Sequence, residues 1–346
     1  MKIKDLYNQK NKQELLDTIK NEDFKRITCS FYKYINIENP EILRNELYIK
    51  WKKLKVLGRI YLSREGINAQ ISIPEQNFKI FKLQLYQYKY FENILLKKAL
   101  IEGVSFIKLV IKIKDEIVAY KVPQNEYDMN NVGKHLDYKE YNKAIDNGAI
   151  VVDMRNYYEG EVGKFKNAII PDVDTSRELL PEVKNLLKGQ ENNKILLYCT
   201  GGIRCEKASS YLLHHGYNDI NQLEGGIIKY AHDIKKNNEE SKFIGKNFVF
   251  DQRLGEKITD DIISLCHQCN RPSNQHTNCQ NQACHILFIQ CELCSNKYNN
   301  CCSEKCFNFI KLPNEEQKTI FKSGKIKFTA QKSTRIKPKL HHINNK

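Results

Sequence analysis

The sequence contains no apolar run of the roughly 18 residues that a membrane-spanning helix needs, and residues 1–20 are polar and charged. The first absence excludes a spanning helix, and the second excludes the apolar centre of a secretory signal peptide. We therefore expect a cytoplasmic protein whose thiols stay reduced. The fingerprints of flavin or nicotinamide binding, such as a G-x-G-x-x-G loop after a strand, are also absent.

Acidic residues are in the minority, since 41 Asp and Glu stand against 56 Lys and Arg and leave a net charge of +15. Such an excess predicts a polyanionic partner, either nucleic acid or an acidic membrane surface. A general drift towards lysine codons is the alternative explanation. The 346 residues, of which 41% are hydrophobic, are enough for two or three globular domains.

The N-terminal third alternates strand-like and helix-like patterns. In residues 107–114, Ile107, Leu109, Ile111 and Ile113 recur with period two, which indicates a strand with one buried side. Further strands are expected at 26–34, 59–61 and 69–73, and helices at 41–57 and 75–87. This order is that of a ferredoxin-like α+β sandwich, which we assign to residues 1–122. Turn residues without periodicity predict a linker at 123–134.

The pattern changes at His135. Short apolar strands are expected at 150–153, 194–198 and 220–223, with helices at 137–145, 179–187 and 205–214. Strands and helices that alternate at these intervals indicate a doubly wound parallel sheet, an α/β fold, which we assign to residues 135–245. Ligands bind at the carboxyl ends of the strands of such sheets. Cys199 directly follows the strand 194–198.

The residues after Cys199 predict a reactive thiolate. The loop is Thr200, Gly201, Gly202, Ile203 and Arg204, and a helix follows it. Backbone N–H groups and the positive end of the helix dipole then point at the sulfur. Such surroundings lower a cysteine pKa from about 8.5 to about 3.5–7.5. The glycines let the backbone curl around an anion, and Arg204 can make a charge-assisted contact to it.

Four segments carry a resemblance to the rhodanese superfamily: Val152–Asn156, Gly163–Ala168, Tyr198–Arg204 and Leu223–Gly226. The resemblance implies that Cys199 carries a persulfide or another transferred group. Phosphatases of the same fold keep five residues between the cysteine and the arginine, whereas four stand here, which argues against phosphatase activity.

A longer match narrows the resemblance. The string Cys199-Thr-Gly-Gly-Ile-Arg-Cys-Glu-Lys207, the earlier string Ser63-Arg-Glu-Gly-Ile-Asn68 and the later cysteine-rich segment resemble the bacterial tRNA uridine(34) hydroxylase family over residues 25–330. Arg64 departs from the acidic residue expected there. The resemblance implies oxygen-dependent formation of 5-hydroxyuridine at the wobble position, with molecular oxygen as co-substrate, the anticodon region of tRNA as partner and Cys199 as the active-site residue.

The residues leave the chemistry open. Cys199 could add to C6 of uracil, or deliver oxygen from a persulfide or sulfenate. Cys205 is either a resolving thiol or a packing residue, and Lys207 and Arg177 are either phosphate contacts or surface charges. Two other functions compete: a sulfurtransferase with a persulfide on Cys199, and a zinc-bearing nucleic-acid adaptor with a vestigial rhodanese domain. The intact loop argues against the adaptor.

Nine of the 12 cysteines lie between Cys266 and Cys306, in a segment that we bound at 246–312. In a reducing compartment this density predicts zinc ligation rather than disulfides. The expected sites are Cys266, Cys269, Cys291 and Cys294 for the first, and Cys279, Cys284, Cys306 and one of Cys301 or Cys302 for the second, with Cys302 preferred. His267, His276 and His285 are possible substitutes, and an iron–sulfur cluster is the alternative.

The C-terminal residues 313–346 have no acidic residue after Glu316. A run of this kind is usually disordered and pairs with a polyanion. Phe321 and Phe328 alternate with the lysines and are candidates for stacking on bases. The predicted RNA contacts are Lys318, Lys322, Lys325, Lys327 and Arg335. A solubilising tail is the alternative.

Overall fold

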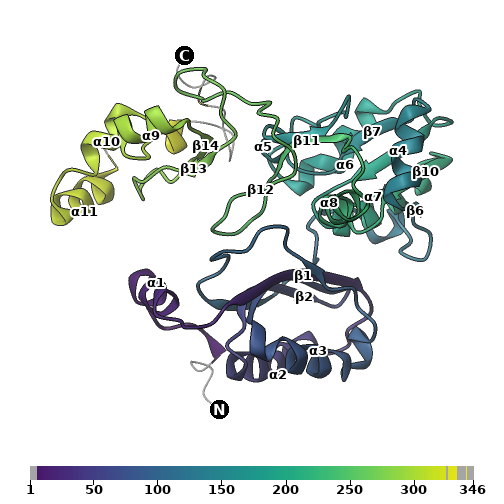
Figure 1. The fold of residues 1–346 in the computed structure, drawn as a ribbon, viewed down its shortest axis with the longest axis horizontal. Coiled ribbons are helices and arrows are strands. Elements are labelled where there is room, and N and C mark those ends of the chain that lie inside the picture. The colour runs from purple at the N-terminus through teal and green to yellow at the C-terminus, as the bar shows by residue number, and fades with distance from the viewer. Residues whose placement is uncertain (1–5, 325, 333–339, 341–346) are drawn as a thin grey trace.

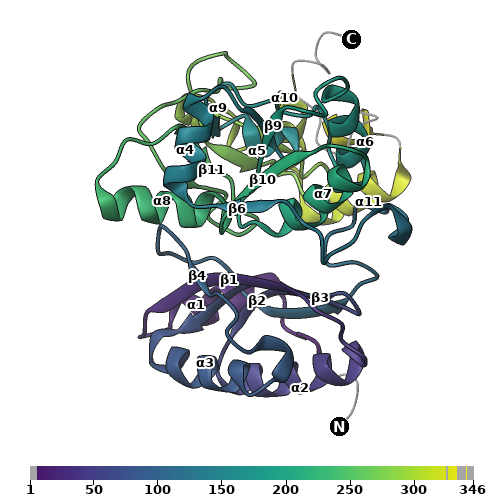
Figure 2. The ribbon, with the colours of Figure 1, turned by 90° about the vertical axis from the view of Figure 1, so that its right-hand side faces the viewer.

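The computed structural model describes residues 6–324, 326–332 and 340, and it has three parts in chain order (Figure 1). An N-terminal α+β domain is followed by a central α/β domain and then by a cysteine-rich segment. Figure 2 shows the sheet of the N-terminal domain turned towards the central domain, with its helices on the outer side. No helix of the described residues is long and apolar enough to cross a bilayer.

The N-terminal domain is a five-stranded sheet of order β4-β1-β3-β2-β5. Alternate residues of its strands face the two helices and form the core, in which Phe31 packs against Trp51 and Phe81. The elements of this part are α1 (Lys12–Lys20), β1 (Arg26–Tyr34), α2 (Pro40–Lys53), β2 (Leu57–Ser63), β3 (Gly66–Pro74), α3 (Phe78–Tyr86), β4 (Lys97–Lys98) and β5 (Leu109–Ile113).

The predicted order of strands and helices is present in this domain, but the sequence does not predict β4. A ferredoxin-like sandwich would place the last predicted strand, 107–114, beside β1. That position belongs to the two-residue β4, which pairs antiparallel with β1. Leu109–Ile113 form β5 at the opposite edge, parallel to β2. A period of two identifies a strand with one buried side but not the edge that it joins.

The central domain is a parallel sheet of order β6-β10-β9-β7 with helices on both faces. In β9, Ile195 and Leu197 pack towards α6 and α7, whereas Leu196 and Tyr198 pack towards α4 and α8. The elements are β6 (Lys134–Leu136), α4 (Tyr138–Asp146), β7 (Ile150–Asp153), α5 (Tyr157–Gly160), β8 (Gly163–Phe165), α6 (Ser176–Leu186), β9 (Lys194–Tyr198), α7 (Ile203–His214), β10 (Asp219–Leu223), α8 (Gly226–Asn237) and β11 (Phe243–Asn247).

The cysteine-rich segment has short strands and helices around its thiols. Its elements are β12 (Glu256–Lys257), β13 (His276–Asn278), β14 (Leu287–Ile289), α9 (Glu292–Tyr298), α10 (Glu304–Phe309), α11 (Asn314–Ser323) and α12 (Thr329–Lys332). Strands β13 and β14 pair antiparallel. Apolar side chains such as Ile286, Phe288 and Phe309 share a core with five of the cysteines: Cys279, Cys284, Cys301, Cys302 and Cys306.

The prediction that residues 313–346 are disordered is wrong for the part that the structure describes. Residues 314–323 form α11. Phe328 is 2% exposed and its ring centroid lies 4.7 Å from that of Phe309, so it is not free to stack on a base. The preceding segment has little apolar surface of its own, and the apolar residues of the basic run complete its core. Lys325 and Arg335 lie outside the described residues.

Candidate active site

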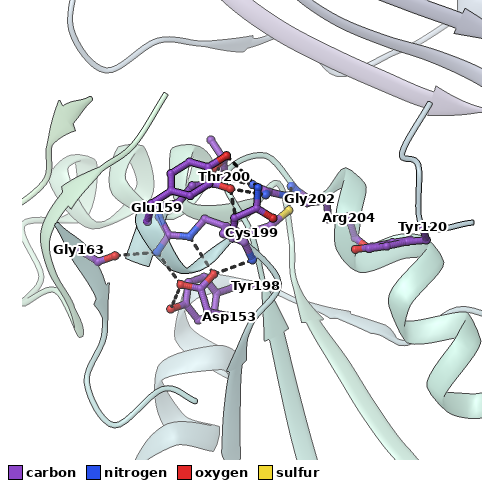
Figure 3. Close-up of polar contacts among 12 residues, drawn as sticks. Tyr120, Asp153, Glu159, Gly163, Tyr198, Cys199, Thr200, Gly202 and Arg204 are labelled. Atoms are coloured by element: carbon purple, nitrogen blue, oxygen red, sulfur yellow. Dashed lines mark hydrogen bonds and ion pairs between the residues drawn. The ribbon is translucent and has the colours of Figure 1, made fainter. Parts of the chain in front are cut away.

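Cys199 lies at the carboxyl end of β9, immediately before the loop that leads into α7. Its side chain has no exposed surface, and the backbone N–H of Gly202 donates to Sγ at 3.1 Å (Figure 3). The first turn of α7 begins at Ile203, so the sulfur lies at the positive end of this helix. The predicted anion cradle is therefore present around the sulfur itself.

The surroundings of Cys199 favour its thiolate. Burial alone opposes ionisation, but a hydrogen bond from Cys205, the charge of Arg204 and the backbone amides of Arg204 and Gly202 outweigh it. Together they lower the pKa of Cys199 to about 5. The pKa of Cys205 moves the other way, well above its ordinary value, because of burial and the hydrogen bond to Cys199. One thiolate and one thiol therefore share this position at neutral pH.

Arg204 is held by a carboxylate that the sequence reasoning missed. Its two terminal nitrogens donate to the two oxygens of Glu159 at 2.6 and 2.9 Å, and one also donates to Oγ1 of Thr200 at 3.3 Å (Figure 3). Glu159 has no exposed surface. The guanidinium thus fixes the loop and lowers the pKa of Cys199 through its charge, and its hydrogen bonds are directed at Glu159 and Thr200.

Gly226 explains why two glycines follow Leu223 and Glu224. Its φ is +67°, and a Cβ at this position would lie 2.6 Å from the carbonyl oxygen of Cys199 and 2.8 Å from the nitrogens of Gly201 and Gly202. The amide of Ile227 donates to the Cys199 carbonyl at 3.0 Å. The start of α8 therefore packs against the back of the cysteine loop without an intervening side chain.

A buried ion pair supports the loop from below. Arg155 donates to Asp153 through Nε and Nη2 and to the carbonyl of Gly163 at 2.7 Å, and Tyr198 donates to Asp153 at 2.8 Å (Figure 3). Neither Asp153 nor Arg155 has exposed surface. The Val152–Asn156 motif thus ties three separate segments of the central domain together beneath Cys199.

The N-terminal domain contacts α7 through two tyrosines and an ion-pair cluster. Tyr32 donates to Glu206 at 2.9 Å, and Tyr34 donates to the carbonyl of Ile203 at 3.3 Å. Lys207 has no exposed surface, and its Nζ contacts Glu65 at 2.7 Å and Glu116 at 3.1 Å. The suggestion that Lys207 contacts phosphate is therefore wrong. Two motifs far apart in sequence, those of Glu65 and Lys207, meet at this interface instead.

The same interface encloses a cavity of about 430 Å³ beside Cys199. Its wall on the N-terminal side is the sheet face opposite the helices, where strand register places Tyr32, Asn68 and Tyr61 in one row and Ser30, Gln70 and Arg59 in the next. Cys199, Thr200, Gly201 and Arg204 line the opposite wall. The strand pattern marks these residues as the outward face of a sheet, but only the structure shows what they face.

The two remaining candidate residues near the loop, Cys205 and Arg177, differ in burial. Cys205 has no exposed surface and packs in the core of the central domain. Its role as a resolving thiol stays a prediction. Arg177 is exposed at the start of α6.

The cysteine-rich segment brings its thiols together in two groups of four. Cys266, Cys269, Cys291 and Cys294 form one, and Cys279, Cys284, Cys302 and Cys306 form the other, with all sulfurs of a group within 4.8 Å of one another. The sulfurs of Cys269 and Cys291 lie 3.5 Å apart, and those of Cys284 and Cys302 lie 3.7 Å apart. A tetrahedral zinc with bonds of about 2.3 Å requires sulfurs about 3.8 Å apart.

The histidines considered as substitute zinc ligands lie outside these groups. Among the described residues, no histidine joins either group. His267 contacts Glu161 at 3.4 Å, and His276 stacks edge-on against Phe248. Cys301 is buried next to the second group, but it is Cys302 that belongs to it. Of the predicted RNA contacts, Lys318, Lys322 and Lys327 are exposed.

The parallel sheet and the Cys199 loop at its carboxyl edge define a rhodanese-type domain. Family models agree with this division: residues 137–233 match the rhodanese-like domain, residues 26–117 the UPF0176 acylphosphatase like domain, and residues 244–307 the model described as rhodanase C-terminal.

Curated relatives are similar over nearly the whole chain. A tRNA uridine(34) hydroxylase from Leptospira interrogans is 49% identical over 344 residues, which cover 99% of this chain and 94% of that protein. A protein of the same name from Pectobacterium carotovorum is 47% identical, over 92% of this chain and 91% of that protein. Another from Photorhabdus laumondii is 46% identical, over 90% of this chain and 90% of that protein. The chain belongs to the tRNA uridine(34) hydroxylase family.

Proposed function

We propose that this chain hydroxylates uridine 34 of tRNA to 5-hydroxyuridine, with molecular oxygen as co-substrate and Cys199 as the reacting group. Family membership supports the reaction. The observation that carries the residue assignment is a cysteine with a pKa of about 5 on the wall of an interdomain cavity. A volume of about 430 Å³ lies in the range of pockets that hold a small molecule or a single nucleotide, and enzymes that act on a base take it out of its stack.

The thiolate has a direct role in such a reaction. Addition of Sγ to C6 of uracil moves the electron pair of the C5–C6 double bond towards C5 and O4, which makes C5 electron-rich. Carbon 5 is then able to attack an oxidant derived from oxygen. Insertion of one oxygen atom leaves the other to be reduced to water, so a donor must supply two electrons and two protons.

The cysteine-rich segment holds two structural zinc ions in this proposal, one in each group of four cysteines. The sulfur spacing supports zinc, because it is close to that of a tetrahedral thiolate site. Closed four-cysteine sites leave no open coordination position for chemistry. Their contribution is folding energy for a segment with few apolar residues.

The exposed lysines of α11 and the residues after it supply part of the tRNA-binding surface in this proposal. Lys318, Lys322 and Lys327 are exposed within one short stretch. Contacts of this kind are made to phosphates and are independent of base sequence.

The reaction is tested in an extract of cells that lack this protein, which supplies the electron donor. Purified protein, unmodified tRNA and ¹⁸O₂ are added, and the nucleosides are analysed by mass spectrometry. Hydroxylation gives 5-hydroxyuridine that carries the heavy isotope. Sulfur transfer gives a thiolated uridine of nearly the same mass as the unlabelled hydroxylated product, but it takes no label from oxygen. A product without the isotope, or no product from the wild-type protein, would refute the proposed function.

A further inference from the structure

Lys97 is a buried cation with no carboxylate in contact among the described residues. It lies on β4 of the N-terminal domain and is 8% exposed. Within the part of the chain that the structure describes, its ammonium group has no hydrogen-bond acceptor or carboxylate in contact. Its neighbour is the ring of Tyr32, whose centroid lies 4.4 Å from Nζ. A charge buried in this way is costly, and the charges of Cys199 and Glu206 offset that cost only in part.

The side chain of Lys97 reaches across the interface to the cysteine loop. It lines the same cavity as Cys199, Thr200 and Gly201. A Cβ placed on Gly201 would lie 3.7 Å from Cε of Lys97, so the lysine chain passes directly over this glycine. Lys97 thus lies between the reactive loop of one domain and the polar sheet face of the other.

The other cations of the cavity wall differ from Lys97 in this respect. Arg204 is held by Glu159. Arg253 contacts Asp251 and Glu256, and Arg59 is exposed. Among the described residues of the cavity wall, Lys97 is the buried cation whose hydrogen-bonding capacity is not already taken by a carboxylate.

We propose that Lys97 is a catalytic residue that donates a hydrogen bond to O4 of uracil while the Cys199 thiolate adds to C6. This inference rests on the proposed function and deepens it. In the addition step the S–C6 bond forms, the C5–C6 π pair moves into a C4–C5 double bond, and the carbonyl pair moves onto O4. The ammonium group of Lys97 stabilises the negative charge on O4 and can pass it a proton. Reversal restores all groups, so the step consumes no oxidant or reductant.

The electrostatics of the cavity agree with this role. Burial lowers the pKa of Lys97 to about 8, while the charges of Cys199 and Glu206 partly oppose that shift. The group is still protonated at neutral pH and is more acidic than an ordinary lysine, which suits a proton donor. Lys97 belongs to the N-terminal domain and Cys199 to the central domain, so the reactive centre is complete only when the two domains are in contact.

The decisive variant is Lys97→Met, which keeps the length of the side chain and removes the charge. Loss of one preorganised donor to a developing oxyanion lowers kcat by about 100- to 1,000-fold. Single-turnover hydroxylation at saturating tRNA measures this loss, and tRNA affinity is expected to change by less than about threefold because Lys97 is buried away from phosphates. Lys98→Met, the exposed neighbour on β4, is the matched control and is expected to keep the wild-type rate.

Two readouts separate catalysis from a structural or thiol-activating role. Removal of a buried, unpaired charge is expected to leave the melting temperature of Lys97→Met unchanged or higher. Alkylation of Cys199 by iodoacetamide, followed at its peptide by mass spectrometry, is expected to slow by less than about tenfold. A lower melting temperature, or alkylation that slows as much as hydroxylation, would make Lys97 a support of the fold or of the thiolate and would overturn the proposal.

Chemical rescue gives an independent result. Lys97→Ala leaves space beside Gly201, and ethylammonium ions are expected to restore at least part of its hydroxylation rate, whereas they leave Lys98→Ala unaffected. Full activity of Lys97→Met, or the absence of rescue in a folded Lys97→Ala protein, would refute the role of Lys97. The wild-type protein still makes 5-hydroxyuridine in either case, so these failures are distinct from a failure of the proposed function.

Discussion

Two regions of this molecule rely on cysteine sulfur, and they stabilise it in different ways. In the central domain, Cys199 ionises because amide N–H groups, a thiol and the Arg204 guanidinium surround one sulfur. In the cysteine-rich segment, four sulfurs lie together in each group. Hydrogen bonds with Cys279, Cys284 and Cys306 raise the pKa of Cys302, so a second negative charge is resisted there.

The comparison shows that a thiolate needs a fixed source of positive potential, and that the source determines its use. Backbone dipoles leave the sulfur of Cys199 without a metal bond and therefore nucleophilic. Four neighbouring thiols cannot all ionise unless a divalent cation neutralises their negative charge. Sulfurs bound to such a cation contribute folding energy. Each of the following experiments changes one side of this comparison.

The largest effect is expected from Cys199→Ser. The hydroxyl group stays protonated in the same cradle, so hydroxylation should fall by about 10⁴-fold or more, as it does when the nucleophile of a covalent enzyme is removed. Nucleoside mass spectrometry measures the activity, and an unchanged melting temperature shows that the fold is retained. Cys205→Ser is the control and should keep part of the activity. Wild-type activity in Cys199→Ser would contradict the assignment of the reacting group.

Gly226→Ala tests the cradle without touching the sulfur. The added methyl group would lie within 3 Å of the Cys199 carbonyl and of two loop nitrogens, so the loop must shift. A displacement of about 1 Å lowers activity by about 100-fold, and the pKa of Cys199 should rise because its amide donors are misaligned. Gly148→Ala, where a Cβ meets nothing within 4 Å, controls for the effect of a glycine replacement at positive φ.

Metal removal tests the two groups of four cysteines. Elemental analysis is expected to give two zinc ions per chain, and Cys284→Ser should lose one of them. The melting temperature should fall by about 5–10 °C, equivalent to a few kcal/mol for a domain of this size, while alkylation of Cys199 stays at the wild-type rate. A metal-free protein of unchanged stability would remove the basis for the proposed zinc sites.

The pH dependence of alkylation distinguishes the two kinds of sulfur directly. Because the pKa of Cys199 is lowered to about 5, its thiolate predominates above that pH. The rate of iodoacetamide reaction at Cys199 should therefore be nearly level from pH 6 to 8 and fall about tenfold by pH 4. A rate that already falls between pH 9 and 7 would show an ordinary thiol.

The smallest effect concerns the basic residues next to the cysteine-rich core. Combined replacement of Lys318, Lys322 and Lys327 by glutamine should flatten the dependence of log affinity for tRNA on log salt by about 2–3, because each phosphate contact contributes about 0.7–0.9. Point replacements are needed here, since truncation would also remove the buried Phe328. The exposed Lys188, Lys235 and Lys236 of the central domain form the control set, and an equal slope change in both sets would exclude a specific contact surface.

Local patterns predicted much of the reactive loop and of the cysteine groups. An apolar strand followed by a cysteine, two glycines and an arginine determines its own geometry. The C-x-x-C spacing of Cys266–Cys269 and Cys291–Cys294 identifies the first set of four thiols, whereas the second set follows from the remaining cysteines and its spacing does not decide between Cys301 and Cys302. These features depend on residues close in sequence or on pairs with a fixed spacing.

The missed features all depend on contacts between parts of the chain that are distant in sequence. Lys97 is one lysine among many, and no local pattern shows that it reaches the loop of another domain. The contact of Glu159 with Arg204 and the sheet edge that β5 occupies could not be predicted for the same reason. The burial of Phe328 follows from the shortage of apolar residues in a neighbouring segment, which a search for patterns within the basic run does not detect.

The contact between Lys207 and Glu65 has a consequence for how this protein can exchange parts with its relatives. The two residues are 142 positions apart, on opposite sides of the linker at which a recombination event would join two genes. A hybrid takes its carboxylates from one parent and its lysine from the other, and it keeps the reactive centre closed only if both parents place matching charges there. The linker is thus a demanding point for recombination, and the two halves are inherited best as a single unit.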